Sequence, residues 1–140
     1  MKQQLALLAM MVASGSMILS THQAPAKPTH TLIFHETQAE FNRRTGDDAP
    51  KYWADWSRYI DSVRATGKVV GGSALLPPQA DHTLGRSLSG QPNRVSGFLT
   101  VSASSDAEAI GMAKGSPAIR NGGTVEVRSH LPMMENEVSQ

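Results

Sequence analysis

The sequence predicts a small α+β domain. Three observations lead to this prediction: one segment has the apolar spacing of an amphipathic helix, several short segments alternate polar and apolar residues as strands do, and the two patterns are interleaved along the chain. A chain of 140 residues is long enough for one domain and no more.

The N-terminal segment has the pattern of a secretory signal peptide. Lys2 gives it a weakly basic start, an apolar run extends from Leu5 to Leu19, and Ala24-Pro25-Ala26 matches the small-residue cleavage pattern. The run is shorter than the ~20 continuous apolar residues of a membrane anchor. We therefore expect export to remove residues 1–26 and to leave a periplasmic or secreted protein with no membrane segment.

Composition excludes several classes of function. The chain has no cysteine, which rules out disulfides and thiolate metal sites. Its 13 basic and 12 acidic residues give a net charge of +1 without a block of either sign, so neither nucleic acid nor an anionic membrane surface is an expected partner. The folded domain is expected over residues 27–131, followed by a loose tail over residues 132–140 that shows no pattern.

The clearest single element is a helix that begins near Asp48 and Pro50 and ends at Gly67. Its apolar stripe recurs at helical spacing and consists of Trp53, Trp56, Ile60 and Val63. This spacing favours a core role for the two tryptophans over a ligand-binding one. The polar segment before the helix, residues 37–48, is expected to be a loop with one helical turn.

The remaining elements are shorter. In the first strand, Leu32 and Phe34 point one way and Thr31, Ile33 and His35 the other. Gly71-Gly72 interrupts a later strand where a bulge or a close backbone approach is expected. Ser105-Asp106 is a helix-capping pair. The expected elements are a strand at 31–35, a strand at 68–76, a long loop at 79–93, a strand at 94–101, a helix from 106 to about 115, a turn at 121–123 and a strand at 124–128.

The predicted order is β-α-β-β-α-β, which is the ferredoxin-like unit. Two helices cover one face of its sheet. The other face would leave Ile33 and Phe98 in water unless a second layer covers them.

Several stretches, in this order and spacing, carry a resemblance to a known family. They are Phe34-His35-Glu36-Thr37 with Phe41 and Arg44, Tyr52-Trp53 with Trp56, Tyr59 and Ile60, Gly67 to Gly72, Leu76-Pro77-Pro78, Gly97-Phe98, Asp106 to Ala109, and Gly122 to Arg128. The chain resembles the YCII-related family, in particular its DGPF-like branch, over about residues 30–128.

This resemblance implies a homodimeric α+β barrel in which two ferredoxin-like units pack sheet to sheet. Some relatives of this kind are lyases or isomerases of small ring compounds, and most have no assigned activity. The chain departs from the family in two places. Ser89-Gly90-Gln91-Pro92 stands where the branch has Asp-Gly-Pro-Phe, and residues 48–67 contain no histidine for the His–Asp pair of shorter relatives.

Strand alternation predicts where a site would lie. His35 and Glu126 are candidate catalytic residues. They lie on the first and the last strand, which are antiparallel neighbours in this unit. A carboxylate beside a histidine allows the histidine to act as a general base. The expected pocket lining, facing the lumen of the barrel, comprises Ile33, Phe98, Thr100, Thr124 and Arg128.

Two simpler interpretations remain open for these residues. His35 would be an ordinary strand-end residue, and Glu126 and Arg128 would form ion pairs across the dimer interface. The five histidines show no metal-ligand spacing and the glycine pairs lack the context of a dinucleotide site, so no metal or cofactor is expected.

The sequence therefore predicts a dimer that binds a small organic molecule. The alternative is a cofactor-independent lyase or isomerase with His35 as the general base.

Overall fold

A computed structural model describes residues 27–77 and 93–131. The expected signal peptide, most of the long loop and the expected tail lie outside the described residues. The elements are β1 (His30–Thr37), α1 (Gln38–Arg43), α2 (Ala49–Arg64), β2 (Val69–Ala74), β3 (Asn93–Val101), α3 (Asp106–Lys114), α4 (Pro117–Arg120) and β4 (Thr124–Ser129).

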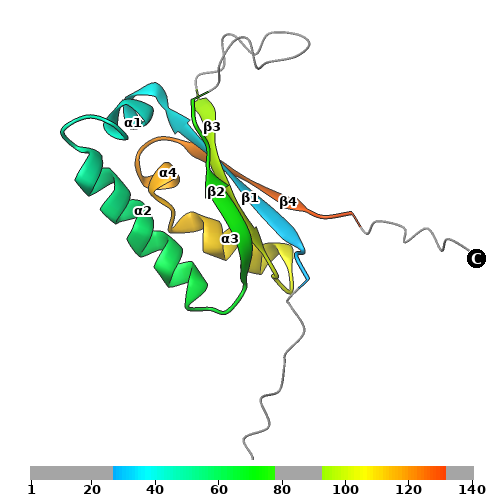
Figure 1. Cartoon of the computed structure of the whole chain (residues 1–140). Coiled ribbons are helices and arrows are strands. Elements are labelled where there is room, and N and C mark those ends of the chain that lie inside the picture. Colours follow the sequence, from blue (N-terminus) through cyan, green and yellow to red (C-terminus); the bar gives the residue numbers. More distant parts are fainter. Residues whose placement is uncertain (1–26, 78–92, 132–140) are drawn as a thin grey trace, which may run out of the picture.

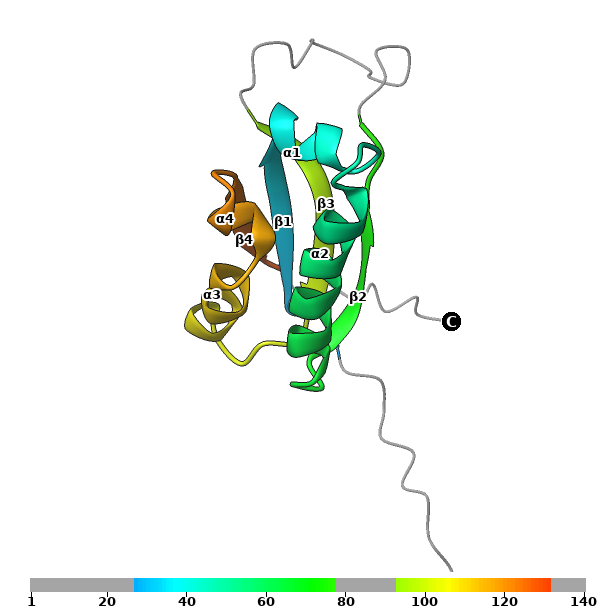
Figure 2. The same cartoon turned by 90° about the vertical axis from the view of Figure 1, so that its left-hand side faces the viewer.

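The four strands form one antiparallel sheet in the order β2-β3-β1-β4. The helices α2, α3 and α4 lie on one side of this sheet, and no described helix covers the other side (Figures 1 and 2). This strand order and layering are those of the ferredoxin-like α+β unit, so the predicted fold class is confirmed.

Alternation along β1 separates the two faces of the sheet. Leu32 and Phe34 are almost fully buried under the helices, and Leu99 and Val101 of β3 join them in the core. Ile33 lies between the two buried residues of β1, faces the other way and is only half-buried. The uncovered side, called the open face below, therefore carries apolar residues.

Two short helices differ from the expectations. Where a loop with one helical turn was expected, α1 forms, because the Thr37 hydroxyl accepts a hydrogen bond from the Glu40 backbone N–H and Phe41 is buried. The helix α4 was not predicted, since no element was expected between residue 115 and the turn at 121–123. Proline fits the first position of a helix, and Ser116 caps this one.

The apolar stripe of α2 is rotated from its expected position. The buried residues of the helix are Tyr52, Tyr59 and Val63, whereas Trp53 is 43% exposed. The core role expected for Trp53 is therefore wrong. Tyr52, Trp56, Tyr59 and Val63 also recur at helical spacing, and both tyrosines of this second stripe are buried.

The expected bulge in the second strand is present. The pairing of β2 with β3 changes register between Val69 and Gly71. At Gly72 the two strands approach so closely that a Cβ atom would lie 2.5 Å from the Phe98 carbonyl oxygen. Only glycine permits this approach.

Candidate functional site

The open face brings His35 and Glu126 together. Nε2 of His35 lies 2.8 Å from Oε1 of Glu126, and Nε of Arg128 donates to Oε2 of the same carboxylate at 2.9 Å. The hydrogen bond from His35, followed by that from Arg128, lowers the pKa of Glu126 below its ordinary value. The expected His–carboxylate contact is confirmed.

The strand register explains this placement. In the pairing of β1 with β4, Ile33 lies opposite Glu126 and His35 lies opposite Thr124. In the pairing of β1 with β3, Ile33 lies opposite Phe98 and Thr31 lies opposite Thr100. Directly paired residues of antiparallel strands point to the same side. All the predicted site residues therefore share the open face: Ile33, His35, Phe98, Thr100, Thr124, Glu126 and Arg128.

Glu126 and Arg128 pair within one chain. Both oxygens of the Glu126 carboxylate are engaged by His35 and Arg128 of the same molecule. The interpretation that these residues also form ion pairs across a dimer interface stays a prediction.

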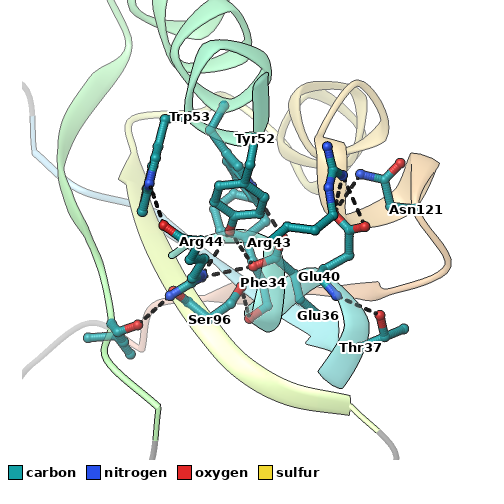
Figure 3. A network of polar contacts seen from close by, with 12 residues as sticks. Phe34, Glu36, Thr37, Glu40, Arg43, Arg44, Tyr52, Trp53, Ser96 and Asn121 are labelled. Atoms are coloured by element: carbon teal, nitrogen blue, oxygen red, sulfur yellow. Dashed lines mark hydrogen bonds and ion pairs between the residues drawn. The ribbon is translucent and has the colours of Figure 1, made fainter. Parts of the chain in front are cut away.

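A second polar cluster, missed in the sequence, lies on the helix side of the sheet. Glu36 is fully buried, and its Oε2 accepts hydrogen bonds from Arg44 Nη2 and from the Tyr52 hydroxyl, both at 2.8 Å (Figure 3). Its other oxygen accepts from the Trp56 indole N–H at 3.2 Å. Burial, helped by the hydrogen bond to Glu36, raises the pKa of Tyr52 far above its usual range.

Arg44 connects this cluster to the rest of the domain. Its Nη1 donates to the carbonyl of Leu75 at 2.6 Å and its Nη2 to that of Ser96 at 2.9 Å, while Nε donates to the Tyr52 hydroxyl at 2.9 Å. One guanidinium thus joins the end of α1 to α2, to the strands β1 and β3 and to the residue that follows β2 (Figure 3). Its role is to hold the elements together, since its donors point to partners inside the protein.

The sequence contains a pattern from which the buried position of Glu36 could have been predicted. The residue continues the inward alternation of Leu32 and Phe34, but the expected strand ended one residue earlier, at His35. A carboxylate at an inward position requires buried partners. Arg44 and Tyr52 are the partners that folding supplies.

A cleft of about 700 Å³ lies between α2 and the strands β2 and β3. Its apolar part includes Phe34, Trp56, Ile60, Val69 and Leu99, and Arg44, Asp61 and Arg64 supply its charged groups. Of the predicted pocket residues, only Phe98 contributes to its lining. This cleft is therefore on the opposite side of the sheet from the predicted lumen.

Fold and cavity together define a ferredoxin-like α+β protein with a concave site large enough for a small molecule. Comparison with known proteins found no family model that matches the chain and no curated protein with significant similarity. Within residues 27–77 and 93–131, no helix is long and apolar enough to cross a membrane. The same residues contain no cluster of three or more side chains that could hold a metal ion.

Proposed function

We propose that the protein binds a small organic molecule in the cleft between α2 and the strands β2 and β3. The observation that carries the proposal is the cleft itself, whose volume of about 700 Å³ falls within the range typical of small-molecule sites. Its lining combines aromatic and aliphatic side chains with a few polar groups, as such sites do.

We further propose that the protein works as an exported homodimer. Support for the dimer comes from the open face, where Ile33 and Phe98 have no covering helix in the described part of the chain. Sheet-to-sheet packing of two ferredoxin-like units is also what the resemblance to YCII-related proteins implies. The open face would then become an internal surface, while the cleft of each unit stays accessible.

The test uses an uncharged fluorescent probe, N-phenyl-1-naphthylamine, titrated into the full chain. Ser57 is exposed and lines the cleft, so Ser57→Phe should obstruct it without disturbing the core. We expect this variant to bind the probe about tenfold more weakly, equivalent to ~1.4 kcal/mol.

The matched control is Ala54→Phe, on the same helix but outside the cleft. It should bind the probe as the unmodified chain does. Equal affinities for the Ser57→Phe and Ala54→Phe variants would contradict the proposal, because binding would then occur elsewhere.

A second candidate function rests on the 2.8 Å contact between His35 and Glu126. We propose it as the alternative: a lyase or isomerase in which the imidazole, oriented by the carboxylate, removes a proton from a small ring compound. Turnover of small lactones that disappears in His35→Gln but persists in His130→Gln would favour it. Turnover that survives His35→Gln would exclude His35 as the base.

A further inference from the structure

We propose that the cleft selects uncharged, flat aromatic ring systems over saturated compounds of the same size. This inference rests on the proposed function and specifies its ligand. It follows from three features of the lining: an aromatic wall, glycines in the wall that faces it, and balanced charges.

The aromatic wall comes from α2. Both tryptophans of the chain, Trp53 and Trp56, line the cleft. The Trp53 indole N–H donates to the Arg44 carbonyl at 3.2 Å (Figure 3) and the Trp56 indole N–H to Glu36 at 3.2 Å. Phe34 supports Trp56 edge-on, with ring centroids 5.1 Å apart. The two indole rings are therefore oriented before any ligand arrives.

The facing wall comes from β2 and β3 and includes three glycines. Gly71 and Gly72 of β2, with Gly97 of β3, contribute to the lining without side chains. At Gly72 a Cβ would meet the Leu99 side chain at 2.9 Å, so this glycine lacks its side chain on the core side of the sheet. At Gly72 the strand therefore presents a flat peptide group to the cleft, beside the side chains of Val69 and Leu99.

A slot between indole rings and peptide planes suits a flat ring. Aromatic rings gain from offset or edge-to-face contact with other rings, and close approach to a flat wall maximises dispersion contacts. A saturated ring of the same carbon skeleton is thicker and has no π-system. It would lose contacts on both walls.

The charged groups of the lining are paired with opposite charges. Arg44 is 2.8 Å from Glu36, and Arg64 is 4.0 Å from Asp61. No described group in the lining therefore leaves a formal charge for the ligand to neutralise. This balance favours an uncharged ligand.

The experiment compares naphthol with its saturated analogue decahydronaphthol, by calorimetric titration into the full chain. We expect naphthol to bind about tenfold more tightly or better. Equal binding of the two compounds would overturn the inference and leave the proposed function standing. Failure of both compounds and of N-phenyl-1-naphthylamine to bind would overturn the proposed function as well.

Two variants test the aromatic wall. Trp53→Leu should lose most of the preference for naphthol, whereas Trp53→Phe should keep most of it. Trp53 is 43% exposed, so neither substitution removes a core side chain. An unchanged preference in Trp53→Leu would contradict the role assigned to this wall.

Discussion

Glu36 shows how a single residue organises this domain. A fully buried carboxylate loses its hydration, and the loss is tolerable only because Arg44, Tyr52 and Trp56 all donate to it. The same hydrogen bonds fix one indole ring of the cleft and one end of α1. Packing and the candidate site therefore depend on one side chain.

Replacing this carboxylate should be costly. We expect Glu36→Gln to lower the free energy of unfolding by about 3–5 kcal/mol, because it leaves the Arg44 guanidinium buried without its counter-charge. Urea unfolding measures the effect. The control is Asp61→Asn, whose pair with Arg64 is exposed and should cost less than ~1 kcal/mol. Similar losses in both variants would refute the special role of Glu36.

The His35–Glu126 pair allows a second test at this scale. Because His35 and Arg128 donate to it, the Glu126 carboxylate should titrate below its ordinary pKa of 4.5. Its ionised form stabilises the fold at neutral pH, and this contribution disappears as the pH falls through the lowered pKa. Observed by NMR, the pKa of Glu126 should rise in His35→Ala.

Glu108 provides the internal control for that titration. Hydrogen bonds from Lys68 and Ser104 lower its pKa to about 2, independently of the open face. Its titration should be the same in His35→Ala. A Glu126 pKa that does not respond to the substitution would show that the pair does not persist in solution.

Among the elements, β2 and α3 use glycine in opposite ways. Gly72 in β2 is required, because a Cβ atom there would collide with β3 and with the Leu99 side chain. At Gly111 in α3 a Cβ atom would have no neighbour within 4 Å, so this glycine only weakens its helix. One glycine permits a close approach of strands, and the other costs helix stability.

These two positions should respond to the same substitution with opposite signs. Gly111→Ala is expected to raise the free energy of unfolding by about 0.5–1 kcal/mol through helix propensity. Gly72→Ala should lower it by about 1–3 kcal/mol through overpacking. Thermal and urea unfolding of both variants provide the measurement. A neutral Gly72→Ala would mean that the two strands can separate without cost.

At the scale of the whole molecule, the main feature is that helices cover only one face of the sheet. The helices bury one face, and the open face carries Ile33 and Phe98 side by side, since they are directly paired across β1 and β3. An apolar pair in the middle of an uncovered sheet is a surface on which a second copy can pack.

The proposed dimer can be tested by measuring the molecular mass in solution. Light scattering at micromolar concentration should give twice the mass of one chain, and Phe98→Glu should give a monomer, because the new charge would be buried between two sheets. Ile110→Glu is the control, since Ile110 is an exposed residue of α3 on the helix side. A monomer at all concentrations would contradict the dimer without affecting the cleft.

The sequence by itself determined the fold class and the open face. Alternation along β1 and β4 is a local property of strands, so it could place His35 and Glu126 on one side of the sheet. The long helix was equally predictable from its spacing, although the choice between two overlapping stripes, one with Trp53 and one with Tyr52, was not.

Only the tertiary structure decided where the cavity lies. The cleft depends on how far α2 stands from β2, and the Glu36 cluster depends on bringing together residues from β1, α2 and the segment between them. Distances between elements are set by the packing of many side chains at once and leave no periodic trace in a single sequence. For this physical reason the sequence could predict a site on the open face but could not predict the cleft on the other side of the sheet.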